Sequence, residues 1–199
     1  MSKATLRTFI AYVEDLPGVL NRVTSLLRRR NYNIASLTVG GTERPGVSRM
    51  TVVLEADEDN ARRIEANLYK LVNVLFVEDT TTAATMVREL GLIKVRADPS
   101  NRGEVMRLCD VFRARVVDVG PEALVAEITG PGDKIDGLVD VLRPFGILEM
   151  VRTGAVVMVR SSEVTEAGIP RSSSPPPDGP AAPTSPTSPS TPPGVIRAA

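Results

Sequence analysis

The sequence is organised around residues 5–37, which read TLRTFIAYVEDLPGVLNRVTSLLRRRNYNIASL. Residues 6–13 are mostly β-branched, aromatic or aliphatic, a composition typical of a short strand. A Pro-Gly turn follows, and apolar residues then recur at helical spacing, at Val19, Leu20, Val23, Leu26 and Leu27. The stretch therefore predicts a strand, a turn, an amphipathic helix and a second strand.

The turn in the middle of this stretch is the best candidate for a ligand site. Asp15 can accept hydrogen bonds from the free N–H groups of the next turn, and Pro17 fits the first turn of a helix. At Gly18, alanine would suit a plain helix better by about 1 kcal/mol. A residue without a side chain lets a ligand approach the exposed N–H groups, and a carboxylate is a natural guest there. The alternative is a tight Pro-Gly turn that binds nothing.

The next segments complete a βαββαβ order, which is typical of a ferredoxin-like α/β fold. Strands are expected at 32–39, 47–55 and 72–78, and a helix is expected to start at Asp57 or Asp59. Right-handed crossovers place both helices on one face of the sheet. The other face needs a cover, and a second copy of the domain is the simplest one.

The second half of the chain predicts the same order of elements. After a threonine-rich link we expect strands and helices in the βαββαβ order. The expected strands are 90–97, 115–119 and 124–129, and one or two closing strands around Gly154 within 146–159; the expected helices are 101–113 and one after Asp133. The chain thus divides into one domain at 4–80, a second at 86–160, and a Pro/Ser/Thr-rich tail at 163–199. The tail cannot bury enough apolar surface to order itself, and a flexible tether or a docking segment are its two interpretations.

Composition excludes several classes of function. The 199 residues carry a net charge of zero, which recommends neither nucleic acid nor an anionic membrane as a partner. There is no histidine, so the commonest general base and metal ligand is missing. The single cysteine, Cys109, lies on an apolar helical stripe, and we expect a buried small hydrophobe in a reducing cytosol. No apolar run approaches the length of a membrane span.

The residues LPGVLNRVTSLLRRRNYNIASLTVG, starting at Leu16, resemble the opening of ACT domains, small modules that bind amino acids. The likeness extends through Ser48-Arg49-Met50-Thr51, Leu71-Val72-Asn73-Val74 and the run from Arg88 to Val95. This longer series is similar to the small regulatory subunit of acetolactate synthase, also called acetohydroxyacid synthase. The resemblance covers about residues 4–160.

The proposed ligand is a free amino acid. The helix N-terminus at Pro17–Leu20 offers backbone N–H groups for its carboxylate, and Asp15 and the Asn33 side chain can accept from its ammonium group. Leu16, Val19 and Ile34 can form an apolar wall. In the resembled family the effector lies between two ACT domains, and the resemblance implies that one chain supplies Asp15 and Gly18 while the other supplies Asn33. The family often has Asn where this chain has Asp15. A helix cap is the structural alternative for Asp15, and a bond to a local turn is the alternative for Asn33.

The resemblance also implies the function. In the biosynthesis of branched-chain amino acids, the chain is expected to dimerise through its ACT domains and to activate a large catalytic subunit. It is expected to inhibit that subunit when valine, or another branched-chain amino acid, binds. Thiamine diphosphate, magnesium and FAD are expected in the large subunit, with no catalytic, cofactor or metal site in this cytoplasmic chain, and the second half is expected to contact the large subunit. The alternatives are a free-standing amino-acid-sensing ACT protein and a ferredoxin-like small-ligand enzyme, which the missing histidines disfavour.

Overall fold

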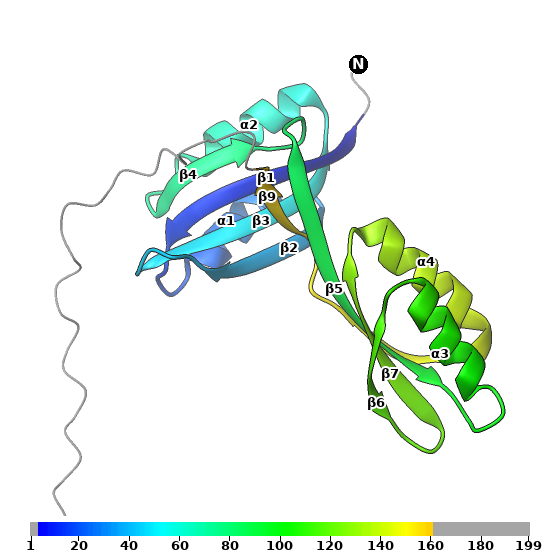
Figure 1. Ribbon diagram of the computed structural model, residues 1–199. Coiled ribbons are helices and arrows are strands. Elements are labelled where there is room, and N and C mark those ends of the chain that lie inside the picture. Colours follow the sequence, from blue (N-terminus) through cyan, green and yellow to red (C-terminus); the bar gives the residue numbers. More distant parts are fainter. Residues whose placement is uncertain (1–3, 161–199) are drawn as a thin grey trace, which may run out of the picture.

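The structure is a computed structural model that describes residues 4–160, and it contains two antiparallel sheets with helices against them (Figure 1). The first sheet has the order β2-β3-β1-β4, so β2 and β4 are its edges. Two helices connect its strands. The bounds are β1 Thr5–Glu14, α1 Val19–Arg29, β2 Ile34–Gly41, β3 Val47–Ala56, α2 Glu58–Leu68 and β4 Val74–Asp79.

The second sheet repeats this topology with the order β6-β7-β5-β8. Its elements are β5 Thr85–Arg96, α3 Arg102–Val111, β6 Arg115–Val119, β7 Ala123–Gly130, α4 Gly132–Leu142, a 3-10 turn at Arg143–Phe145, and β8 Ile147–Arg152. A last strand, β9 Val156–Val159, pairs with the first residues of β5. The predicted fold, two ferredoxin-like α+β units, is confirmed; the division of the chain at residues 80 and 86 stays a prediction.

Each sheet has its own hydrophobic core, because the apolar side of each helix faces one side of its sheet. The first core includes Phe9, Leu27 and Ile64, and the second includes Ile93, Leu124 and Leu138. Cys109 lies in the second core, as the apolar stripe predicts, and burial raises the pKa of its thiol. No helix within residues 4–160 is long and apolar enough to cross a membrane.

The other face of the first sheet is covered by its own chain, so the predicted cover by a second copy is wrong there. Residues 85–88 of β5 pair with residues 156–159 of β9 and form a two-stranded ribbon that crosses this sheet in Figure 1. Val157 on β9 is 2% exposed, and Ile10 and Thr51 on the sheet are 3% and 2% exposed. The Arg49 guanidinium donates to the Val157 carbonyl. The ribbon therefore joins the two units.

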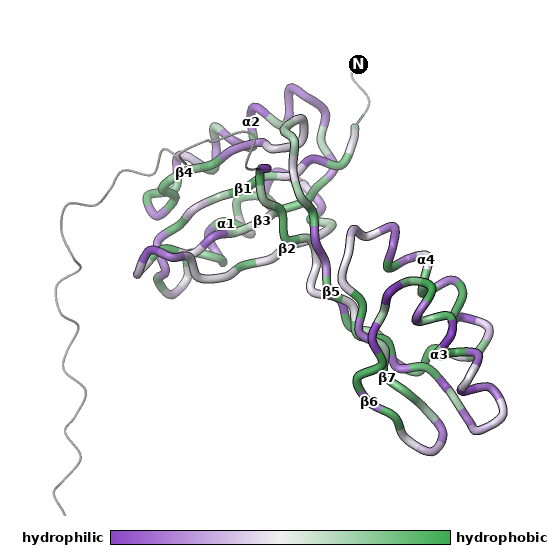
Figure 2. Tube along the Cα trace, in the orientation of Figure 1, coloured by the Kyte–Doolittle hydropathy of each residue, from purple (hydrophilic) through white to green (hydrophobic). Residues whose placement is uncertain are grey.

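The outer face of the second sheet has no such cover in the described chain. Figure 2 shows hydrophobic residues along β6 and β7, and the exposed apolar side chains on this face include Leu92 and Val151, which pair with each other across β5 and β8. A small hollow of about 180 Å³ on this face is lined by Leu92, Lys94, Val125, Glu149 and Val151. This face is consequently the largest difference in packing between the two units.

Most element boundaries lie within a few residues of those predicted. The clearest differences are that β5 starts five residues earlier than predicted, at Thr85, and that α1 starts at Val19. Asp57 begins α2, because its carboxylate accepts from the Asn60 N–H at 2.8 Å. The predicted tail at 163–199 lies outside the described residues.

Candidate functional site

The predicted ligand turn connects β1 to α1. Its backbone is held by three bonds: from the Asp15 N–H to the Gly46 carbonyl at 2.9 Å, from the Leu16 N–H to the Glu14 carbonyl at 3.0 Å, and from the Val19 N–H to the Leu16 carbonyl at 3.3 Å. Gly18 is the N-cap of α1, with φ at 86°. This left-handed conformation suits glycine, because a Cβ there would be strained. The left-handed conformation of the turn is therefore one reason why position 18 is a glycine.

The predicted cap at Asp15 is wrong. No side chain caps α1, and Pro17 precedes the cap instead of lying in the first helical turn. The first N–H groups of a helix have no partner inside the helix. In α1 the Val19 N–H donates to the Leu16 carbonyl of the turn, and a ligand or solvent can take the others. A Cβ built on Gly18 would meet no atom within 4 Å, and the space above the turn is therefore open.

The N-terminus of α1 also differs from the others in its charge. Among the four α-helices in residues 4–160, α1 alone has no acidic residue in its first turn; the others carry Glu58 and Asp59, Glu104, and Asp133. An acidic residue there compensates the positive end of the helix dipole. The start of α1 is left uncompensated, which favours an anionic guest such as a carboxylate.

Asn73 holds the turn in place, a role that no motif in the sequence predicts. Its side-chain amide donates to the Glu14 carboxylate at 2.6 Å and accepts from the Arg22 guanidinium, while its carbonyl accepts from the Glu14 N–H at 2.9 Å. The end of β1, the first turn of α1 and the start of β4 are thereby tied together.

Leu16 and Leu20 stay exposed, whereas Val19 is buried in the first core and was wrongly expected in a ligand wall.

The remaining predicted site residues, Asn33 and Ile34, lie at the other end of α1. They form part of an open groove of about 570 Å³, whose other lining residues are Asn21, Thr24, Ser25, Arg28, Asn31 and Tyr32. Tyr32 fixes this end by donating from its hydroxyl to Asn60 at 3.2 Å. Positions 21, 24, 25 and 28 follow the spacing of one helical face, so a polar stripe in the sequence could have revealed the groove.

Within one chain the two halves of the predicted site are far apart. The helix between Gly18 and Asn33 has 11 residues, and at 1.5 Å per residue it is about 16 Å long. The sheet agrees, because Glu14 pairs with Val47 at one end of β3 and Ile34 pairs with Leu54 near the other. One amino acid cannot contact both halves in the same chain.

This arrangement of strands and helices, with an open turn before the first helix, is that of an ACT domain. The family described as "AHAS small subunit-like ACT domain" matches residues 9–76, and the family described as "Small subunit of acetolactate synthase" matches residues 88–161.

Relatives match both halves together. A probable acetolactate synthase small subunit from Archaeoglobus fulgidus is 46% identical over 156 residues, covering 78% of this chain and 98% of that relative. The acetolactate synthase small subunit of Mycolicibacterium smegmatis is 44% identical over 161 residues, covering 80% and 95%. The crystal structure of the small subunit from Thermotoga maritima superposes with a TM-score of 0.74 at 35% identity, covering 78% and 98%. The chain belongs to the acetolactate synthase small-subunit family.

Proposed function

We propose that this chain regulates an acetolactate synthase by binding valine between two copies of its ACT domain. The observation that carries the proposal is that the two halves of the site lie at opposite ends of α1, next to the free edge of β2. A two-fold axis at that edge would run the two copies antiparallel, since symmetric dimers use the same patch on both chains. The turn of one copy would then face Asn33 of the other, and a dimer would hold two sites.

The turn offers what a free amino acid needs. The uncompensated N-terminus of α1 suits the carboxylate, and the Asp15 carboxylate suits the ammonium group. The amide of Asn33 can bond to either group. Exposed Leu16 and Leu20, together with Ile34, supply apolar surface for a small branched side chain. This combination favours valine over a polar or much larger amino acid.

The family membership implies a large catalytic subunit as the partner. In this proposal the large subunit holds thiamine diphosphate, magnesium and FAD and performs the chemistry, and this chain has no catalytic site. The cytoplasm is the proposed location for both subunits. The second unit would contact the large subunit and hold it in a more active state, and the exposed apolar face of its sheet supports this role. Valine would lower that activity through a coupling of about 1–3 kcal/mol.

Mixed dimers test the shared site. One chain carries Gly18→Asn, which tolerates a left-handed conformation better than other residues but fills the space above the turn. The other carries Asn33→Ala, which removes a hydrogen bond to a charged group worth about 1.5–3 kcal/mol. Each homodimer should bind valine at least about tenfold more weakly than the wild type, as measured by calorimetry.

The mixed dimer should recover about half the wild-type number of sites at normal affinity, because one site is rebuilt intact and the other carries both changes. If both residues of a site come from the same chain, every site in the mixed dimer carries one lesion and no high-affinity binding returns. Co-purification with the large subunit separates a regulatory subunit from a free-standing amino-acid sensor.

A further inference from the structure

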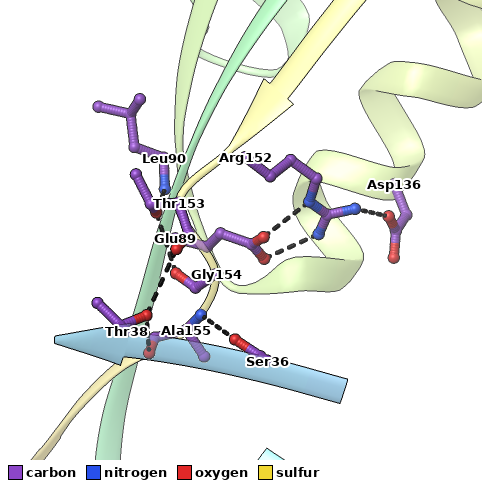
Figure 3. Close-up of polar contacts among 9 residues, drawn as sticks. All are labelled: Ser36, Thr38, Glu89, Leu90, Asp136, Arg152, Thr153, Gly154 and Ala155. Carbon is purple, nitrogen blue, oxygen red and sulfur yellow. Dashed lines mark hydrogen bonds and ion pairs between the residues drawn. The ribbon is translucent and has the colours of Figure 1, made fainter. Parts of the chain in front are cut away.

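The loop between β8 and β9 lies directly against β2, the edge strand that begins at Ile34, directly after Asn33 (Figure 3). The Ala155 N–H donates to the Ser36 hydroxyl at 3.0 Å. The Thr38 hydroxyl donates to the Ala155 carbonyl at 3.1 Å, and the Thr153 carbonyl is a second, longer acceptor at 3.4 Å. We call this set of contacts, from Ser36 and Thr38 to residues 153–155, the β2 clasp.

Gly154 is the residue that allows this close approach. Its φ is 81°, and a Cβ built on it would lie 2.5 Å from the Ser36 Oγ and 3.2 Å from the Thr38 Oγ1. Any side chain here would be strained in its own backbone and would push the loop away from β2. Glycine is therefore required at this position for two reasons: its positive φ, and the closeness of the Ser36 hydroxyl.

The other side of the loop is tied to the second unit. The Thr153 N–H donates to the Leu90 carbonyl, and the Leu90 N–H donates to the Thr153 hydroxyl, both at 3.1 Å. Arg152 makes two bonds to the Glu89 carboxylate, at 2.7 and 2.8 Å, and a third to Asp136 on α4 at 2.6 Å. Charge-assisted, bidentate pairs of this kind are the strongest side-chain contacts. The loop therefore moves together with β5 and α4.

The strand on the opposite side is less constrained. β2 has one neighbouring strand, and its register shifts between Ile34 and Ser36. A cleft of about 580 Å³ beside the clasp leaves room for movement; it is lined by Leu6, Ala35, Ser36, Leu37, Val53, Glu89, Arg152, Thr153, Gly154 and Ala155. A ligand that repositions Asn33 acts two or three residues from Ser36, so a shift of this strand reaches the clasp directly.

We propose that the β2 clasp is the contact through which ligand binding at the start of β2 reaches the second unit. This inference rests on the proposed function and names the residues that transmit regulation. Ligand binding changes the fit of Ser36 and Thr38 against residues 153–155, and the loop passes the change to β5 and α4 through Arg152. Ser36, Thr38 and Gly154 are positioning residues and touch no ligand.

Two variants of the full chain test the clasp. Thr38→Val keeps the size of the side chain but removes the hydroxyl, and Gly154→Ala pushes the loop outward. Their matched controls are Thr82→Val, in the exposed link between the same two units, and Gly120→Ala, where a Cβ comes no closer than 3.5 Å to any atom. Valine is the ligand used, and its affinity is measured by calorimetry.

The readout is hydrogen exchange of the Leu90, Thr153 and Ala155 amides with and without valine. In the wild type and both controls, saturating valine should change these rates at least threefold. In the two clasp variants valine should bind within about threefold of the wild-type Kd while that change disappears. The reconstituted enzyme with the large subunit should then keep its activation and lose its inhibition by valine.

The outcomes separate the two proposals. A wild-type chain that does not bind valine overturns the proposed function and the clasp with it. Normal binding, with an unchanged exchange response and normal inhibition in both clasp variants, overturns the clasp alone. Thr38→Val keeps the test valid if Gly154→Ala does not fold.

Discussion

The two units place an ion pair at the same position in the sheet but reverse its charges. The ladders β1–β4 and β5–β8 have a register shift at Tyr12/Val13 and at Lys94/Val95, so the two sheets can be aligned at these points. In this alignment Arg7 matches Glu89. Likewise, Asp79, which pairs with Phe9, matches Arg152, which pairs with Gly91. The topology fixes where the pair lies but not which strand carries which sign.

The surroundings of the two pairs differ as well. Arg7 makes one bond to Asp79 at 3.0 Å, whereas Arg152 makes two to Glu89 and one to Asp136. The neighbouring helix in the first unit carries Glu65, and burial together with the charges of Asp79 and Glu78 raises the pKa of Glu65. The bonds to Glu89 raise the pKa of Arg152 further above its usual value. The acid on the helix therefore repels Asp79 in the first unit and attracts Arg152 in the second.

The cover of the outer sheet face is the second contrast, and it predicts the largest effect. Val157→Asp places a carboxylate between the ribbon and the first sheet, where burying a charge is costly. We expect a loss of at least about 3–4 kcal/mol in the free energy of unfolding, measured by denaturant titration. Met158→Asp is the matched control on the next residue of β9, which is 60% exposed, and should change stability by no more than about 0.5 kcal/mol. Equal effects of the two variants would mean that the ribbon does not pack on the sheet.

Charge reversal tests the alignment of the two ion pairs. Arg7→Glu brings a third acid to Asp79 and Glu65, and we expect a loss of about 3 kcal/mol, near the lower end for breaking a buried pair. Both side chains are 17% exposed, so solvent screens the charges only in part. Adding Asp79→Arg copies the polarity of the second unit and places a guanidinium beside Glu65. In a double-mutant cycle, the stability of the double variant should return to within about 1 kcal/mol of the wild type. If the losses of the two single variants simply added, the two ion pairs would not be equivalent.

The sequence predicted the cores well, because helical periodicity reports burial directly. The apolar stripe of α4, at Ile135, Leu138, Val139 and Leu142, is fully buried, as is most of the stripe of α1. Leu20 is the exception, being 44% exposed. Leu20 lies in the first turn of α1, beside the open site. In the proposed dimer it would contact the second copy instead of the core of its own chain.

The joint between the units could not be predicted in the same way. Ser36 and Ala155 are 119 positions apart, and hydroxyl side chains on a strand have no periodic signature. Gly154 looked like an ordinary turn glycine, because its close neighbours come from the other unit. The predicted site was identified residue by residue only through resemblance, and its two halves are not brought together by one chain.

A second glycine at positive φ separates the roles of Gly18. Gly18→Asn and Gly146→Asn both place a side chain at positive φ, 86° and 93°. Gly18 lies in the left-handed helical region with ψ at −7°, where a side chain costs about 1–2 kcal/mol, whereas Gly146 has ψ at 97° and lies outside that region. Gly146→Asn should therefore lose at least as much stability as Gly18→Asn, as measured by thermal unfolding. Valine affinity should fall at least about tenfold only in Gly18→Asn, because only this residue borders the proposed site. A similar loss of affinity in Gly146→Asn would mean that destabilisation alone explains the effect.

The smallest effect concerns Glu65 and depends on pH. Its pKa is raised above the ordinary value of 4.5 by burial and by Asp79 and Glu78, so the folded state holds a proton on this carboxyl to higher pH than the unfolded state. The resulting stability is present below the ordinary pKa and is lost as pH rises through the folded value. At pH 7 the charged side chain therefore destabilises the fold, and Glu65→Gln should stabilise it by a few tenths of a kcal/mol, as expected for removing a like-charge contact. The gain should shrink as the pH falls and Glu65 takes up its proton. Glu55→Gln, on an exposed strand position, should show no such pH dependence in the same unfolding series. If Glu65→Gln instead destabilises the fold at pH 7, the contact between α2 and β4 is attractive and the contrast with Asp136 and Arg152 does not hold.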